Sequence, residues 1–267
     1  RCFRLDAHLD RLNASLGKLG LHCGLLRDDW HEITQTVTEH NAGLIAAEED
    51  LLVNHLVTAG ENPAYGRHTG SDTQPPVTIC VQAYRIPFAR WADRYSSGQR
   101  LIVPEIRQIP PQCLDPTIKS RNRLHWYLAD RQAREIDTQA SALLLDLNDH
   151  LTETSAGNFY IVRDKTICTP QRSRTLNGVS QLVLRDIAGY LGLNFEERDI
   201  CVNEALAAEE ALTTSTSYCV LPVTQLNGQP IGDGKPGPVF RNILETWNLS
   251  VGLDIARQAE TQSCRAG

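Results

Sequence analysis

The chain has 267 residues, of which 41% are hydrophobic and 22% are charged, and its formal net charge is −6 at pH 7. This composition is that of an ordinary globular protein large enough for two domains. The net negative charge, with no basic stripe, argues against nucleic acid as a partner. No apolar run approaches the roughly 18–20 residues that span a membrane, and no signal peptide is visible, so we expect no membrane association.

The eight cysteines form no C-x-x-C pair, which argues against a zinc site. Their wide spacing favours reduced thiols in the cytoplasm, with a disulfide framework as the alternative. The chain begins with Arg1 and contains no methionine. We therefore expect an N-terminal truncation, with residues 1–5 as the end of a strand.

Helical spacing of four leucines predicts a first helix over residues 6–19, with Asp6 as N-cap and Gly20 as its end. A second helix follows from residue 28 or 29 to about residue 40. Alternating apolar residues predict strands over 50–58 and 77–84. The stretch 59–76 between them is rich in Gly, Pro, Asn and Thr and is expected to be a loop, in which Arg67 and His68 could contact a substrate carboxylate.

Four prolines punctuate the segment before Lys119, and we interpret residues 104–117 as an interdomain linker. The expected domains are a small N-terminal α+β domain, residues 1–112, and a larger C-terminal domain, residues 113–267. The larger domain is predicted to contain a set of helices and strands. The helices are expected at 122–136, 182–191, near 203 and at 238–247, and the strands at 142–147, 159–162, 166–169, 197–202, 212–216 and 220–225. An Asn-Gly pair at 227–228 predicts a hairpin turn.

The segment 151–159 places an acidic residue and a small polar turn between two apolar runs. Upstream lies Lys119, one of only four lysines among 26 basic residues. A lysine amine can form a Schiff base and an arginine cannot. Lys119 followed by Glu153 therefore suggests a pyridoxal phosphate site, with the amine for the aldehyde and the carboxylate for the ring nitrogen. The alternatives are a solvated lysine and a surface glutamate.

Gly178, Val179 and Ser180 open a predicted helix. Unpaired N–H groups at a helix N-terminus form a natural phosphate site, and the hydroxyl of Ser180 can add to it. An ordinary N-cap serine is the alternative interpretation.

Five segments in one order over nearly the whole chain resemble the class IV aminotransferase family, the fold-type-IV pyridoxal phosphate enzymes. This family includes branched-chain aminotransferases, D-amino acid aminotransferases and aminodeoxychorismate lyase. The segments are 8–12 (HLDRL), 119–124 (KSRNRL), 151–158 (LTETSAGN), 176–180 (LNGVS), and 214–217 (TSTS) with 221–223 (LPV). The resemblance implies an α/β (α+β) fold in which a small α+β domain precedes a larger domain with a barrel-like β core, and a cofactor between the two.

The resemblance also assigns roles to single residues. Lys119 matches the Schiff-base lysine, which holds the cofactor and moves a proton between the substrate α-carbon and the cofactor. Glu153 matches the partner of the pyridine nitrogen. The phosphate-binding residues are matched by Arg11, Gly178, Val179, Ser180 and Thr216. The backbone amides of Ser217 and Tyr218 match groups that often bind a substrate carboxylate in the family.

Two positions depart from the family pattern. Where the family usually has an arginine after the phosphate-binding hydroxyl residue, this chain has Gln181. Many members have a tyrosine five residues after the lysine, and here that position is Leu124. The Lys-x-x-Asn-Arg-Leu pattern is closer to lyase or D-amino acid members than to typical branched-chain ones.

The leading hypothesis for function is transamination between a small-molecule amino acid, branched-chain or small aliphatic, and a 2-oxo acid, by a cytoplasmic homodimer. A lyase of the aminodeoxychorismate type, which eliminates pyruvate, is the second hypothesis. A non-enzymatic binding protein is the third. A requirement for an amino acceptor distinguishes the first hypothesis from the second.

Overall fold

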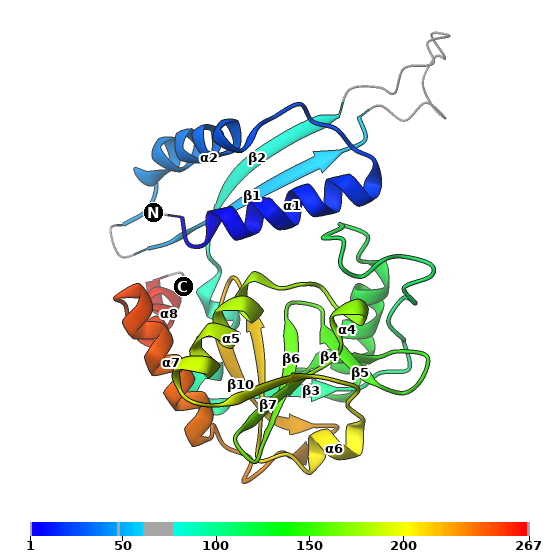
Figure 1. Cartoon of the computed structure of the whole chain (residues 1–267). Coiled ribbons are helices and arrows are strands. Elements are labelled where there is room, and N and C mark those ends of the chain that lie inside the picture. Colours follow the sequence, from blue (N-terminus) through cyan, green and yellow to red (C-terminus); the bar gives the residue numbers. More distant parts are fainter. Residues whose placement is uncertain (1, 47–48, 61–76, 266–267) are drawn as a thin grey trace. The chain divides into compact units, whose positions relative to one another are not determined.

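The computed structural model describes residues 2–46, 49–60 and 77–265 (Figure 1). The chain separates into two compact units, Arg1–Pro87 and Phe88–Gly267. This division falls before the expected boundary between residues 112 and 113. The reason is β3 (Gln99–Ile102), a strand that the sequence did not predict, which pairs within the sheet of the second unit. The segment 104–117, interpreted as a linker, therefore runs inside the second unit.

The described residues of the first unit form two helices and a strand pair. These elements are α1 (Leu5–Leu19), α2 (Arg27–Ala42), β1 (Leu51–Thr58) and β2 (Thr78–Arg85). β1 and β2 are antiparallel, and α2 packs on them through Trp30, whose ring lies 5.6 Å from that of His55. The predicted helices and strands are confirmed, and Gly20 ends α1 with a φ of 65°.

The start of the first unit differs from the prediction. Residues 3 and 4 form a turn rather than the end of a strand, and Arg4 occupies the N-cap position of α1. Asp6 instead lies in the first turn of α1, where its carboxylate accepts hydrogen bonds from Arg27 and His31 of α2. The predicted loop 59–76, with Arg67 and His68, lies outside the described residues except for its first two.

Nine strands build the sheet of the second unit. Besides β3 they are β4 (Ser141–Leu145), β5 (Leu151–Thr154), β6 (Asn158–Arg163), β7 (Thr166–Thr169), β8 (Asn194–Glu197), β9 (Glu210–Ser215), β10 (Cys219–Leu226) and β11 (Gln229–Pro230). β3 pairs with β4, β4 with β5, β5 with β6, β6 with β9, β9 with β10, and β10 with β3. These six strands therefore close into a barrel, as the resemblance implied.

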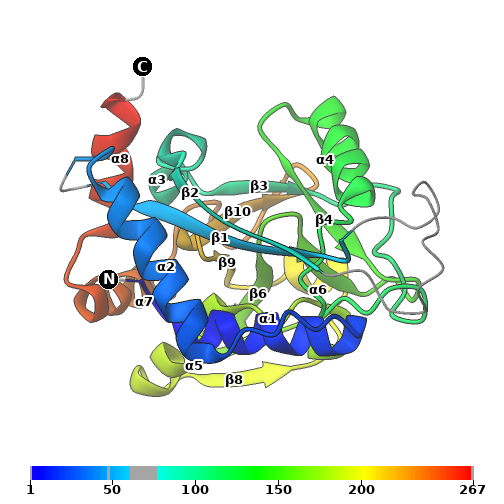
Figure 2. The ribbon, with the colours of Figure 1, turned by 90° about the horizontal axis from the view of Figure 1, so that it is seen from above.

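Helices surround this barrel. They are the single-turn helices η1 (Phe88–Arg90) and η2 (Arg172–Arg174), and the α-helices α3 (Arg94–Ser97), α4 (Leu124–Ile136), α5 (Val179–Tyr190), α6 (Val202–Leu206), α7 (Pro238–Val251) and α8 (Ile255–Arg265). α4 packs along β3 and β4, and α5 packs against β8, β9 and α7 (Figure 2). No helix in the described ranges is long and apolar enough to cross a membrane.

Alternation along β6 sends its side chains to two different environments. Phe159 and Ile161 belong to a buried apolar cluster with residues of β3, β4, β5 and β10. Asn158 and Tyr160 share the opposite face of the strand, and the Tyr160 hydroxyl lies 2.8 Å from that of Thr214 on β9. The strand thus directs Asn158 and Tyr160 away from the apolar cluster that its other face helps to form.

Three predicted elements of the second unit need correction. No strand is predicted at residues 151–154, but they form the buried strand β5, and only 155–157 turn. The strand predicted at 197–202 is β8, which ends at Glu197 because it follows the register of β7, from Thr166↔Asn194 to Thr169↔Glu197. The helix near 203 is α6, with Cys201 as N-cap.

Glu210 joins the barrel to α7. Its side chain is 8% exposed, and its two carboxylate oxygens accept hydrogen bonds from Val239 N (2.7 Å) and Phe240 N (2.9 Å) in the first turn of α7. A negative charge at a helix N-terminus is stabilising because it satisfies N–H groups that have no intrahelical acceptor.

Replacing Glu210 by glutamine is expected to lower the free energy of unfolding by about 1–3 kcal/mol, because the neutral amide loses the charge and one acceptor. Urea unfolding of the purified protein measures this loss. The neighbouring substitution Glu209→Gln is the control. Glu209 is exposed and accepts one hydrogen bond, from Asp164 N, so its substitution should change stability by less than about 0.5 kcal/mol. Equal effects of the two substitutions would contradict the capping role of Glu210.

Candidate functional site

The turn between β5 and β6 is tight and closely packed. The Thr154 hydroxyl donates to Gly157 O (2.9 Å) and accepts from Gly157 N (2.9 Å). A Cβ atom on Gly157 would lie 2.3 Å from Thr214 O and 2.4 Å from the Tyr218 hydroxyl. Only glycine fits there, so the turn lies directly against the β9–β10 connection.

The Glu153 carboxylate is buried, and N–H donors from several segments of the second unit hold it. Oε2 accepts a hydrogen bond from Leu176 N (3.1 Å) and a longer one from Asn158 Nδ2 (3.5 Å). Oε1 accepts from Gln108 Nε2 (3.4 Å). Hydrogen bonds to both oxygens fix the plane of the carboxylate.

Asn158 connects Glu153 to the start of α5. Its Nδ2 also donates to Leu176 O (2.8 Å), two residues before the N-cap Gly178. A Cβ atom on Gly178 would lie 2.1 Å from Asn158 Oδ1. The absence of a side chain at 178 therefore lets the N-terminus of α5 approach β6 and Glu153.

The first turn of α5 has the geometry of an anion site. The first intrahelical hydrogen bonds run from Gln181 N and Leu182 N to Gly178 O, so the N–H groups of Val179 and Ser180 have no intrahelical acceptor. Val179 and Ser180 are both buried. Gln181 is 1% exposed, and neither polar atom of its amide has a partner among the described residues. A buried amide without a partner costs about 1–3 kcal/mol. The Gln181 amide and the first-turn N–H groups are therefore available to bind a polar ligand.

The connection between β9 and β10 carries Thr216, Ser217 and Tyr218. Thr216 is exposed and Ser217 is half-buried. Tyr218 points inward, where its hydroxyl donates to Thr213 (3.2 Å) and its carbonyl accepts from the Tyr95 hydroxyl (2.8 Å). Burial raises the pKa of the Tyr218 phenol to about 12, so the phenol is neutral. The side chain of Tyr218 therefore anchors this turn. Its backbone N–H is the group that the family resemblance assigns to the substrate carboxylate.

Lys119 lies in the loop that precedes α4, and its side chain is exposed. Four residues later Arg123, the N-cap of α4, donates a hydrogen bond to Ser155 O in the β5–β6 turn. Burial lowers the pKa of Arg123, and the nearby charges of Glu153 and Asp130 act in the opposite direction. The loop that carries Lys119 is thus tied to the turn that follows Glu153.

Arg11, the last of the predicted cofactor-binding residues, belongs to the first unit. It lies on α1, where its Nη2 is 3.5 Å from His8 Nδ1. Within the second unit the structure brings together Glu153, the start of α5 and, through Gly157, the turn that carries Thr216, Ser217 and Tyr218.

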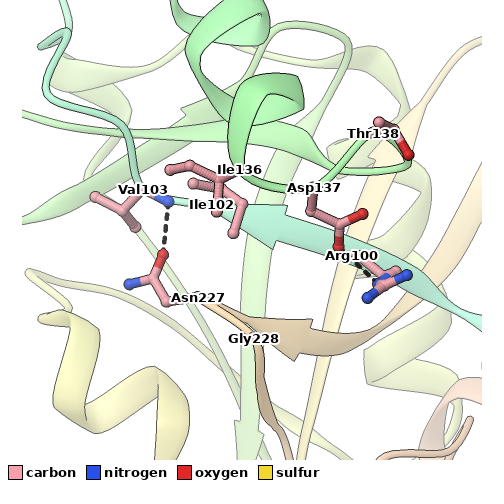
Figure 3. A pocket seen from close by; sticks show the side chains of 8 residues that line it. All are labelled: Arg100, Ile102, Val103, Ile136, Asp137, Thr138, Asn227 and Gly228. Carbon is pink, nitrogen blue, oxygen red and sulfur yellow. Dashed lines mark hydrogen bonds and ion pairs between the residues drawn. The ribbon is translucent and has the colours of Figure 1, made fainter.

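A hollow of about 670 Å³ lies elsewhere on the second unit (Figure 3). It is lined by the end of α4, by β3 and by the turn at Asn227 and Gly228. The Arg100 charge in it is paired with Asp137 (2.8 Å), and the Asn227 side chain accepts from Val103 N (2.8 Å). None of the predicted site residues lines it, so we assign no chemistry to this hollow.

Comparison with known proteins identifies the family. Residues 1–226 match the family model "Amino-transferase class IV". The chain therefore belongs to the class IV aminotransferases, a family of pyridoxal phosphate-dependent enzymes.

The curated relatives carry two kinds of name. The "D-alanine aminotransferase" of Bacillus licheniformis is 28% identical over 260 residues, which cover 96% of this chain and 85% of that protein. The "Branched-chain-amino-acid aminotransferase-like protein 1" of Arabidopsis thaliana is 29% identical over 248 residues, 91% of this chain but 42% of that protein.

Solved structures resemble the fold over most of the chain. A branched-chain amino acid aminotransferase from T.th., solved with pyridoxamine 5'-phosphate, has a TM-score of 0.79 and 25% identity, and the match covers 92% of this chain and 77% of that one. The branched-chain amino acid aminotransferase of Escherichia coli has a TM-score of 0.79 at 21% identity, with 92% and 78% covered, and shows the fold alone.

Sequence reasoning missed three residues that surround Glu153. Asn158 belongs to the motif 151–158 but received no role of its own, although a polar residue that opens an otherwise apolar strand could have indicated a buried hydrogen bond. Arg123 belongs to the motif 119–124, also without a role of its own, and donates to Ser155 O in the turn after Glu153. Gln108 reaches the site from a segment distant in sequence, and no local pattern indicated its contact with Glu153.

Proposed function

We propose that this protein is a pyridoxal phosphate-dependent aminotransferase that transfers an amino group from a branched-chain or small aliphatic amino acid to a 2-oxo acid. The observation that carries the proposal is the position of the Glu153 carboxylate. Donors from β6, from the loop before α5 and from the segment before Lys119 hold it beside the start of α5. A carboxylate and a phosphate-type site in one unit, with a lysine on an adjoining loop, match the chemistry of this cofactor.

The residues present fit a phosphate-bearing cofactor. Gly178 lets the start of α5 lie against Asn158, since a Cβ atom at residue 178 would be 2.1 Å from Asn158 Oδ1, and the buried Gln181 amide has no partner among the described residues. The first-turn N–H groups and the Ser180 hydroxyl supply donors for phosphate oxygens. The match to the family motifs adds Arg11, as a guanidinium for two oxygens, and Thr216, as a hydroxyl, to the proposed set.

Pyridoxal phosphate supplies an electrophilic aldehyde and an electron-withdrawing ring that stabilises negative charge at the substrate α-carbon. The Lys119 amine would hold the cofactor through its aldehyde carbon and, once the substrate amine takes its place there, would be available to move the proton of the substrate α-carbon. Glu153 would accept a hydrogen bond from the ring nitrogen and so favour its protonated form. The backbone N–H groups of Ser217 and Tyr218 bind the substrate carboxylate and so orient the α-carbon.

Substrate choice is the finer part of the proposal. The relatives are named for two substrates, D-alanine and branched-chain amino acids, which differ in stereochemistry and size. Both kinds of substrate are small and aliphatic. A homodimer is also part of the proposal, supported by Leu124 and Tyr127, which lie one turn apart on α4 with 65% and 63% of their surface exposed. The proposed location is the cytoplasm, on the ground of the widely spaced cysteines.

The test supplies the purified protein and pyridoxal phosphate with one amino donor at a time, L-leucine, L-valine or D-alanine, and with 2-oxoglutarate as acceptor. We expect 2-oxo acid and glutamate in equal amounts from at least one donor. When the acceptor is omitted, the reaction should stop after one turnover. Preference for D-alanine or for L-leucine fixes the stereochemistry.

A lyase gives the opposite pattern. Sustained pyruvate release from aminodeoxychorismate, without any acceptor, would replace the proposed transamination by elimination. Cofactor binding without turnover of any of these compounds would favour a binding protein. The control is the same assay without added pyridoxal phosphate after dialysis, which reports how much of the turnover depends on the cofactor.

A further inference from the structure

Gln108 lies buried between Glu153 and His125, and its amide has a defined orientation. Its Oε1 is 3.1 Å from Ile109 N. A backbone N–H can only donate, so the atom that faces it must be the amide oxygen. The amide nitrogen is therefore the atom that faces Glu153, and it donates to Oε1 of that carboxylate at 3.4 Å.

His125 on α4 secures this orientation. Its Nε2 lies 3.1 Å from the same Gln108 Oε1, so Nε2 must carry the proton and donate. Burial, assisted by the charge of Arg123, lowers the pKa of His125, so the ring is neutral near pH 7. Nδ1 is buried and has no hydrogen-bond partner among the described residues, as expected for the unprotonated nitrogen. Two donors on Gln108 Oε1 make the reversed amide unfavourable.

The backbone of Gln108 is fixed as well. Its N–H donates to Leu145 O at the end of β4 (2.9 Å), so the side chain starts from a position set by the barrel. Glu153 is then held from two sides, with Leu176 N and Asn158 at Oε2 and Gln108 at Oε1. Loss of the Gln108 donor would remove this hydrogen bond from Oε1, so the plane of the carboxylate would be held less firmly.

We propose that Gln108 is a positioning residue that holds the Glu153 carboxylate toward the ring nitrogen of pyridoxal phosphate, and that His125 fixes the direction in which the Gln108 amide donates. This inference rests on the proposed function. Two hydrogen bonds link His125 on α4 through Gln108 to Glu153 on β5, and we call these three residues the relay. With the cofactor bound, the relay would hold the carboxylate in the orientation that keeps the ring nitrogen protonated.

The chain offers a matched control in Gln132 on α4. Its Oε1 accepts a hydrogen bond from Ile106 N (3.3 Å), so it anchors the same segment of backbone as Gln108. No hydrogen bond joins it to Glu153 among those of the described residues. Gln108→Leu and Gln132→Leu therefore remove the same functional group from the same region, and only the first removes a donor to Glu153.

The experiment loads each variant with pyridoxal phosphate labelled with ¹⁵N in the ring and records the chemical shift of the ring nitrogen and the affinity for the cofactor. Wild-type protein and Gln132→Leu should give the shift of a protonated ring nitrogen. Gln108→Leu should move the shift toward the unprotonated value. It should also weaken cofactor binding about tenfold, the effect of one hydrogen bond to a charged group.

Two further variants keep the test decisive if Gln108→Leu fails to fold. Gln108→Met keeps the length of the side chain but removes the amide donor, so it should also move the shift. His125→Gln keeps a donor to Gln108 and should retain the wild-type shift, whereas His125→Leu should lose part of it. Equal shifts and affinities in Gln108→Leu, Gln108→Met and Gln132→Leu would overturn the inference. Absence of bound cofactor in the wild-type protein would instead overturn the proposed function, and the relay with it.

Discussion

Replacing Lys119 by alanine is expected to abolish the visible absorption band that pyridoxal phosphate gives with the wild-type protein, and to lower transamination at least about 10³-fold. General acid–base catalysis alone contributes about 10²–10⁴-fold, and the same amine is the covalent partner of the aldehyde. Because Lys119 is exposed on a loop, the variant should still unfold cooperatively in urea, which separates loss of the amine from loss of the fold. Absorption spectroscopy, a coupled transamination assay and urea unfolding measure the three quantities.

Lys235→Ala is the matched control for this substitution. Lys235 is also exposed on a loop of the second unit, where its backbone N–H donates to Asp233. It should keep the band and the activity. Reduction of the wild-type complex with borohydride, followed by peptide mass analysis, should locate the cofactor on the peptide with Lys119. A band that survives in Lys119→Ala, or an adduct on another lysine, would remove Lys119 from the proposed mechanism.

Gly178→Ala is expected to destabilise the protein by about 1–3 kcal/mol and to weaken the binding of pyridoxal phosphate at least tenfold. The added Cβ would lie 2.1 Å from Asn158 Oδ1, so Asn158 or the start of α5 must move. Either movement disturbs the hydrogen bonds of Asn158 to Leu176 O and to Glu153. Urea unfolding and titration of the dialysed protein with the cofactor measure the two effects.

The same helix provides the control. A Cβ atom on Gly189, near the end of α5, would meet nothing within 4 Å. Gly189→Ala should therefore stabilise the protein by about 0.5–1 kcal/mol, through the helix propensity of alanine, and leave cofactor affinity unchanged. If Gly178→Ala bound the cofactor as tightly as Gly189→Ala, the start of α5 would not be the phosphate site.

The sequence predicted those parts of the fold whose signals are local. The leucine spacing of α1, the alternation in β2 and the Asn-Gly turn after β10 are each set by residues close together in the chain. In that turn Asn227 and Gly228 have φ values of 52° and 74°, which the two-residue hairpin requires. The barrel core followed from the family resemblance rather than from such patterns.

The elements that the sequence missed depend on partners distant in the chain. β3 has only four residues, and its strand character comes from pairing with β4 and β10. β5 contains Thr152, Glu153 and Thr154, which resemble a polar turn until the Thr152 hydroxyl is seen bonded to Leu144 O. α8 has an apolar stripe too sparse to predict, and it packs against η1 at the start of the unit.

The site divides in the same way. Lys119, Glu153 and the residues at the start of α5 could be proposed because each lies in a motif with a known chemical role. Gln108 and His125 could not be proposed from the sequence. Gln108 contacts Glu153 across 45 positions of sequence. His125, 28 positions from Glu153, reaches it only through its hydrogen bond to Gln108. The departure at Gln181, where the family usually has an arginine, was visible in the sequence. That the glutamine amide is buried and unpaired among the described residues was not.

The closure of the barrel by β3 has a consequence for the way the chain is synthesised and folded. Val223 pairs with Gln99 and Leu226 with Leu101, so the ring closes only between residues that are more than 120 positions apart. During translation, β3 and β9 keep open edges until β10 has left the ribosome. Open edges recruit other strands, and such distant pairing is slow. Chains released before residue 226 should therefore aggregate, whereas shortening the chain from its end within α8 leaves the ring complete.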